Sequence, residues 1–196
     1  MRKLIASLIL WFTPALVHAQ SVPVQIRGHF IGEPVERFIH LEADVREELE
    51  VCDQHPRASF CQQLVGAMER GDRTEISASI TPDLDHPDAS KDTINFVLEG
   101  KKLVKMTMLL NDMSDVAALG HPSSESDVAS HGAAGAKWTN HLTTWDMQDC
   151  YATVYQDNNP SLEDRRPIFT MESREEHARE STGGATAVAA KATPAK

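Results

Sequence analysis

The stretch TINFVLEGKKLVKMTMLL, residues 93–110, decides the fold, because its apolar residues alternate on both sides of a glycine. Such alternation is typical of strands with one buried face, and glycine supplies the positive φ of a tight turn. We therefore predict a β-hairpin that turns at Glu99-Gly100. The side chains expected to face the core are Ile94, Phe96, Leu98, Val104, Met106, Met108 and Leu110.

Two helical patterns precede this hairpin, at residues 32–52 and 57–71. In both, apolar residues recur at the three- and four-residue spacing of a helix with one buried face. We expect the helices that contain Phe38 and Leu64 to cover the hairpin's apolar face. Glu42 interrupts the first apolar face, so the pattern predicts either a kinked helix or two abutting helices.

Further strands are predicted where apolar residues alternate again, at residues 22–30, 74–80, 137–157 and 166–173. Short helices are expected at 114–120 and 174–180, and the segment 121–137, rich in serine, glycine and alanine, predicts a long surface loop. This order of elements predicts an α+β fold. In it, the N-terminal helix pair and a short helix pack on one face of an antiparallel sheet, in two layers.

The hairpin segment FVLEGKKLVKM, the helix end LGHP and the tryptophan-bearing strands after it resemble small secreted bacterial proteins of unknown function. The layout of residues 28–173 also resembles the two-layer fold of the BamE and beta-lactamase-inhibitor group. Members of that fold bind other proteins, so the resemblance implies a fold and a binding role but no binding residues. The chain departs from the group by lacking a lipobox cysteine and by carrying the segment 121–137.

Residues 1–19 have the parts of a secretory signal peptide. Two basic residues precede an apolar run that ends at Leu16, and Val17-His18-Ala19 has the small-any-small pattern of a cleavage site. The run is shorter than the roughly 20 residues that span a bilayer, which disfavours the alternative of a retained anchor. We expect cleavage after Ala19 and a secreted or periplasmic mature chain with no membrane span.

The remaining composition predicts one α+β domain over residues 20–180 and a disordered tail of alanine, threonine and glycine over residues 181–196. Loss of Arg2 and Lys3 with the leader changes the formal net charge from −10 to −12. An acidic chain is poorly suited to nucleic acid or anionic lipid, so we expect an unidentified protein or small ligand as the partner.

Cys52 and Cys61 flank the connector between the two helical patterns. In an oxidising compartment this pair predicts a disulfide, and closing a loop of about ten residues stabilises the fold by roughly 2.5 to 3 kcal/mol. Free thiols and a metal or redox site are the alternatives, but CxxC pairs are absent. Cys150 predicts a buried strand residue, with a dimer-forming thiol as its alternative.

The segment TPDLDHPDASKD, residues 81–92, gathers four side chains that hold metals in other proteins: Asp83, Asp85, His86 and Asp88. Their oxygen atoms suit calcium or magnesium. The segment lacks the glycine and the closing glutamate of an EF-hand loop, and Asp and Pro are common in solvated turns. We therefore favour a turn and keep the four residues as metal candidates.

No motif in the sequence indicates a catalytic centre or a cofactor. REEHARE lacks the HExxH pattern, no GxSxG is present, and HGAAGAK lacks the spacing of a phosphate loop. His29, His40 and His141 are candidate bases without a nucleophile beside them in the sequence.

Two hypotheses of different class follow. The first is an exported, non-catalytic binding protein that uses the open face of its sheet and the segment 121–137. The alternative is a small secreted hydrolase or metal-dependent enzyme that uses the segment 83–88 and a histidine. A pocket in which titratable groups converge would favour the enzyme.

Overall fold

The computed structural model describes residues 23–52, 54–79, 93–132 and 135–190, with side chains described as far as Thr182. The helical elements are α1 (Val35–Leu41), α2 (Ala43–Cys52), α3 (Ser59–Val65), the π-helical turn η1 (Gly66–Arg70), the 3-10 helix η2 (Met113–Leu119) and α4 (Arg174–Ala190). The strands are β1 (Thr74–Ser79), β2 (Thr93–Glu99), β3 (Lys102–Leu109), β4 (Ser124–His131), β5 (Lys137–Asp146), β6 (Cys150–Gln156) and β7 (Ile168–Ser173). Within the described ranges, no helix is long and apolar enough to cross a membrane.

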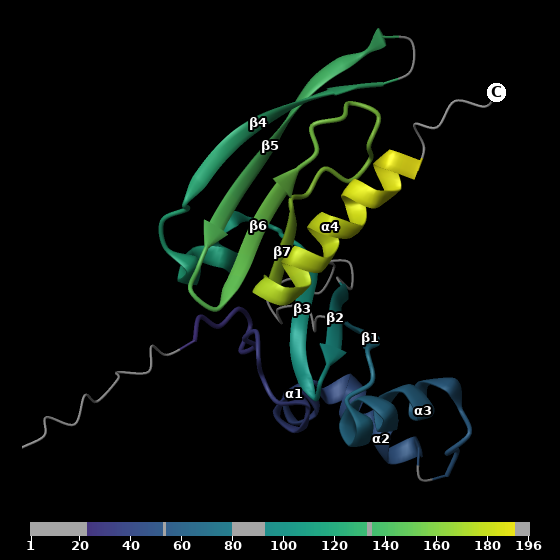
Figure 1. Cartoon of the computed structure of the whole chain (residues 1–196). Helices are drawn as coiled ribbons and strands as arrows, with labels where there is room; N and C mark the ends of the chain where they lie inside the picture. Colours follow the sequence, from purple (N-terminus) through teal and green to yellow (C-terminus); the bar gives the residue numbers. More distant parts are fainter. Residues whose placement is uncertain (1–22, 53, 80–92, 133–134, 191–196) are drawn as a thin grey trace, which may run out of the picture.

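The strands form one seven-stranded sheet in the order β1-β2-β3-β7-β6-β5-β4. Every neighbouring pair is antiparallel. The sheet thus consists of two meanders, β1 to β3 and β4 to β7, joined where β3 pairs with β7 (Figure 1). The predicted α+β class is confirmed.

The predicted hairpin is formed by β2 and β3. Gly100 and Lys101 both have positive φ, +59° and +63°, which is the conformation of the two-residue turn that matches the twist of a hairpin. The register shifts between Val97 and Leu98, so that Leu98 pairs with Leu103. This irregularity corrects one prediction: Leu103 is buried in the core, whereas Val104 is only half-buried.

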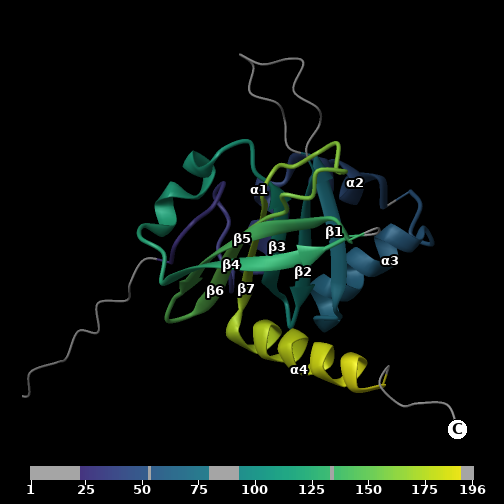
Figure 2. The same cartoon turned by 90° about the horizontal axis from the view of Figure 1, so that it is seen from above.

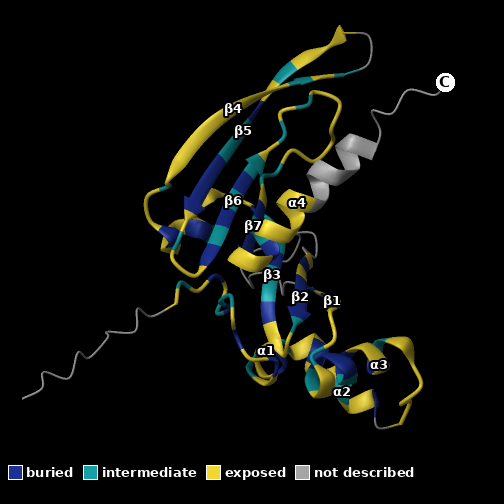
Figure 3. Cartoon of the chain, in the orientation of Figure 1, coloured by how far each residue is buried: buried dark blue, intermediate teal, exposed yellow. Residues whose placement is uncertain are grey.

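One face of the sheet, here called the core face, carries the hydrophobic core. Across the strands its central row consists of Ile76, Phe96, Met106, Met171, Ala152 and Trp145, all buried. The helices α1 to α3 and η2 contribute Phe38, Leu64 and Val116 to the same core, and the rings of Phe38 and Phe96 meet edge to face with centroids 4.9 Å apart. Figure 3 shows this buried band under an exposed periphery.

The opposite face of the sheet, here called the open face, is approached by α4 alone among the helices. In Figure 2, α4 lies on one side of the sheet and α1 and α2 lie on the other. The helix begins directly after β7 and turns back across the sheet, so its first turns lie over the neighbouring strands.

The described part of the strand predicted at 22–30 does not join the sheet. It makes a tight turn in which Ile26 and His29 exchange backbone hydrogen bonds, with positive φ at Arg27 and Gly28. At Glu42 the structure has two abutting helices, because that residue is extended between α1 and α2. The turn and this break together bring the side chains of His29 and Glu42 into contact.

Two segments expected to lack regular structure differ from the prediction. Residues 124–131, inside the expected loop 121–137, form β4 and pair with β5 over their whole length. The helix α4 continues past Ser181 to Ala190, into the segment predicted as a disordered tail. The signal peptide expected at residues 1–19 lies outside the described residues.

Candidate binding surface

The corner between α2 and α3 is closed by the predicted disulfide. Cys52 and Cys61 are joined with their Cα atoms 5.4 Å apart, and Cys150 is a free, buried cysteine in β6. Burial, assisted by the charge of Asp149, raises the pKa of the Cys150 thiol. A hollow of about 510 Å³ beside the disulfide is lined by Leu49, Cys52, Pro56, Cys61, Gln62, Val65 and Arg70. Among the described residues of that lining, Arg70 is the single ionisable group.

His29 is a buried histidine in the N-terminal turn. Its side chain is buried against Phe38 and Phe96, and its ring nitrogens lie 2.8 Å from Glu33 and 2.7 Å from Glu42. Burial by itself lowers the pKa of His29, but the hydrogen bonds and negative charges of the two carboxylates outweigh it and raise the pKa to about 9. The imidazolium therefore holds the N-terminal turn against α1 and α2.

The other candidate residues are not brought together. His40 is exposed on α1, and the exposed His141 of β5 pairs with Asp127 across the strand at 3.0 Å. Asp83, Asp85, His86 and Asp88 lie outside the described residues. In the ranges that are described, no three histidine, cysteine or acidic side chains are placed to hold a metal ion.

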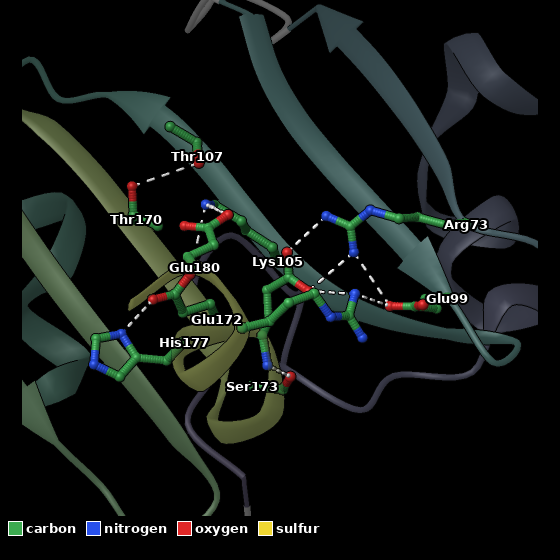
Figure 4. A network of polar contacts seen from close by, with 11 residues as sticks. Arg73, Glu99, Lys105, Thr107, Thr170, Glu172, Ser173, His177 and Glu180 are labelled. Carbon is green, nitrogen blue, oxygen red and sulfur yellow. Dashed lines mark hydrogen bonds and ion pairs between the residues drawn. The ribbon is translucent and has the colours of Figure 1, made fainter. Parts of the chain in front are cut away.

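The start of α4 is attached to the open face by ion pairs (Figure 4). Arg73, at the start of β1, donates to both carboxylate oxygens of Glu176, at 2.6 and 2.9 Å. Arg179 bridges Glu176 and Glu99, at 3.0 and 2.7 Å. Only 1% of Glu176 is exposed, and it is the one buried side chain in the described part of the helix, residues 174–182. Hydrogen bonding to Arg73 lowers the pKa of Glu176.

A second polar cluster lies beside this one. The carboxylate of Glu172, on β7, receives a hydrogen bond from His177 at 2.7 Å, and the His177 ring stacks on Tyr151. Lys105 lies 3.5 Å from the other oxygen of Glu172 and 2.5 Å from Glu180. The first turns of α4 therefore cover the charged row of the open face with charged side chains.

Three rows of side chains cross the open face. The charged row, beneath α4, contains Lys105, Glu172 and Tyr151. The next is a hydroxyl row made by Thr107, Thr170, Thr153 and Thr144. The third, here called the apolar row, consists of Leu109, Ile168, Tyr155 and Leu142, one from each of four neighbouring strands.

The apolar row is not buried. Ile168 is 39% exposed, and the other three side chains of the row are half-buried. The hydroxyl of Tyr155 accepts a hydrogen bond from the buried amide of Asn140, which fixes the ring in the row. Contiguous exposed apolar side chains bordered by polar ones are typical of an interaction site.

Sequence reasoning named the open face of the sheet but not the four residues of the apolar row, although a signal for them is present. In TMLL and YATVY apolar residues occupy both phases of the alternation, so both faces of β3 and β6 carry them. The ion pairs of α4 have no such signal, since Arg73 and Glu176 are 103 residues apart.

Comparison with known proteins returned no matching family model and no matching curated protein or solved structure.

Proposed function

We propose that the protein is an exported, non-catalytic binding protein that holds a protein partner on the open face of its sheet. The observation that carries this proposal is the apolar row, in which the exposed Ile168 stands side by side with the half-buried Leu109, Tyr155 and Leu142. Covering such a row with a partner is favourable, because each Å² of apolar surface removed from water stabilises the complex by about 25 cal/mol.

The shape of the surface favours a protein over a small ligand. Neighbouring strands lie about 4.8 Å apart, so the four side chains form a ridge roughly 14 Å long. Small molecules prefer concave pockets, whereas protein interfaces combine an apolar centre with a polar rim. The hydroxyl row beside the ridge provides such a rim, with Thr107 and Thr170 on adjacent strands.

Export is supported by two independent features. The disulfide between Cys52 and Cys61 is of the kind that forms and persists in oxidising compartments. The N-terminal residues have the charge, length and cleavage pattern of a signal peptide. The intact mass of the protein from the exported fraction tests this part, since a chain beginning at Gln20 is expected and a chain retaining residues 1–19 contradicts it.

The binding surface is tested with two matched aspartate substitutions. Ile168→Asp puts a charge in the apolar row, and Val51→Asp puts one on an apolar side chain that is 51% exposed on α2. The tagged mature protein and both variants are used to capture partners from the exported fraction, and the affinity of each captured protein is then measured by calorimetry. Ile168→Asp is expected to weaken binding at least about tenfold, as loss of a central apolar contact does at interfaces.

Val51→Asp is expected to bind as the parent does, and both variants are expected to keep the melting temperature of the parent. If every captured protein binds the Ile168→Asp variant and the parent equally, the open face is not the binding surface and the proposal fails.

A further inference from the structure

The outer strand β4 is a sheet edge that no other element in the described part of the chain covers. It pairs with β5 over eight residues without a register shift, it contains neither proline nor lysine, and all of its side chains except Ser130 are exposed. Proteins usually guard such an edge with prolines, charged side chains, bulges or a covering element, and of these β4 has only the charges of Glu125 and Asp127. The other edge strand, β1, is guarded, since Ile76 and Ala78 are buried and α2 packs against it.

The ladder between β4 and β5 determines which backbone groups point outward. Gly132 donates its N–H to the carbonyl of Ala136, so the residue pair next to the hairpin loop is a hydrogen-bonded pair. Hydrogen-bonded and non-hydrogen-bonded pairs alternate in antiparallel strands, so every second residue of β4 turns its N–H and C=O away from β5. The outward residues are Glu125, Asp127, Ala129 and His131. Among the described residues, no backbone group bonds to them on that side.

An antiparallel copy of β4 fits this edge in one symmetric register. With the two-fold axis through Val128, the outward residues face one another: Glu125 faces His131, and Asp127 faces Ala129. Between them, Val128 meets its own copy and Ser126 meets Ser130, at non-hydrogen-bonded positions. Val128 is 43% exposed, so the axis buries an apolar side chain that the single chain leaves in water.

Other symmetric registers are worse. If the two-fold axis passed between two residues, each residue with outward N–H and C=O groups would face a residue whose groups point to β5. The hydrogen bonds between the two copies would then not form. An axis through Asp127 opposes two aspartates, and an axis through Ser126 opposes Glu125 and Asp127, which repel. An axis through Ala129 leaves Glu125 beyond the end of the partner strand.

We propose that β4 pairs antiparallel with β4 of a second copy of this chain, with the two-fold axis at Val128, so that the sheet continues through both copies. The contact is isologous, the common arrangement in symmetric dimers. It is small, because one strand from each copy makes it, and it is therefore a weak, concentration-dependent association. It does not depend on the proposed function, since the apolar row lies inside the sheet and not at its edge.

The register is tested by cysteine cross-linking of the full mature chain. Val128→Cys is expected to form a disulfide-linked dimer on mild oxidation, because facing side chains at a non-hydrogen-bonded pair have Cβ atoms about 5 Å apart. Leu41→Cys is the matched control, since Leu41 is 42% exposed on α1. Ser126→Cys and Ser130→Cys are expected to cross-link when mixed and not when each is alone. The register is wrong if Val128→Cys cross-links no faster than Leu41→Cys. It is also wrong if the mixture of Ser126→Cys and Ser130→Cys stays monomeric.

The association itself is tested by sedimentation of the unmodified chain from micromolar to millimolar concentration. Ala129→Pro removes one outward N–H from each copy and leaves the ladder to β5 intact, so it is expected to weaken dimerisation at least about tenfold without changing the melting temperature. Ile168→Asp is expected to leave dimerisation unchanged.

The proposal is refuted if the chain is monomeric at every concentration, or if Ala129→Pro does not weaken the dimer. The proposal also fails if the β4 amides are protected from hydrogen exchange only when another exported protein is added.

Discussion

The helices at the two ends of the chain lie on opposite faces of one sheet and are held there by different forces. The helix α1 buries Val35, Phe38 and Ile39 in the core. The described part of α4 buries one residue, Glu176, and is held by arginine and lysine side chains from the sheet. Apolar burial is not screened by salt, whereas an ion pair with an exposed partner, such as Lys105 with Glu180, is. The contrast implies that α4 opens before the N-terminal helices do.

The largest effect is expected in the core. Phe38→Ala removes a fully buried ring that contacts Phe96 and His29, and it is expected to lower the free energy of unfolding by about 3–5 kcal/mol. Leu41→Ala, on the exposed side of the same helix, is expected to cost less than about 1 kcal/mol. Urea unfolding measures both. Equal losses in the two variants would contradict apolar attachment of α1.

The next effect concerns the buried charge at the N-terminal end. His29 has a pKa of about 9 in the folded protein against an ordinary value of 6.5. Below pH 6.5 both states hold the proton and the stabilisation is complete. Between pH 6.5 and 9 the unfolded chain binds fewer protons, so stability falls as the pH rises, by up to about 3 kcal/mol in total.

This dependence is measured as the free energy of unfolding of the parent and of His29→Gln between pH 6 and about 9.5, a window that brackets the two pKa values. The difference between the two proteins is expected to shrink as the pH rises, while the exposed His40→Gln follows the parent. A constant difference would show that His29 has the same pKa in the folded and the unfolded chain.

The disulfide comes third. Replacing Cys52 and Cys61 with serine is expected to lower the free energy of unfolding by roughly 2.5 to 3 kcal/mol, because the cross-link acts largely on the unfolded chain. Binding by the open face is expected to survive below the new melting temperature, since the corner lies away from it. A double variant that keeps its stability and loses its binding would make the cysteines a functional site.

The smallest effect on global stability is expected in α4. Glu176→Gln keeps a hydrogen-bond acceptor for Arg73 but removes the charge, which is expected to cost about 1 kcal/mol. Amide exchange in the first turns of α4 is expected to accelerate in this variant, and also in the parent at 1 M salt, where the screening length is about 3 Å. Amides of α1 are expected to be unaffected, and the exposed Glu175→Gln is the control. If the rate of amide exchange in α4 does not depend on salt concentration, the contrast between α4 and α1 is wrong.

The sequence predicted those parts of the fold that burial patterns specify. The hairpin of β2 and β3, the helices with Phe38 and Leu64 and the paired cysteines all carry local apolar or geometric signals. The strand β4 was missed because both of its faces meet solvent, so SESDVASH shows no alternation. Its position depends on hydrogen bonds to β5, which no property of its own residues indicates.

The surface on the open face was less predictable. Glu172 and His177 are five residues apart, but their pairing depends on the angle at which α4 leaves β7. Leu109, Ile168, Tyr155 and Leu142 become neighbours only when the order and register of four strands are known. The shift at Val97 and Leu98 changed which of Leu103 and Val104 is buried, because a bulge reverses the phase of alternation.

The join between the two meanders has a consequence for folding kinetics. Thr107 of β3 is aligned with Thr170 of β7, 63 residues further along the chain, whereas the other pairings of the sheet connect consecutive strands. Closing so long a loop costs chain entropy before the contacts it permits are made, and pairings between distant residues slow folding. Until β7 arrives, β3 is an open edge that carries Met106 and Met108. The pairing of β7, the last described strand, with β3 is therefore the step that determines how long the nascent protein is prone to aggregation.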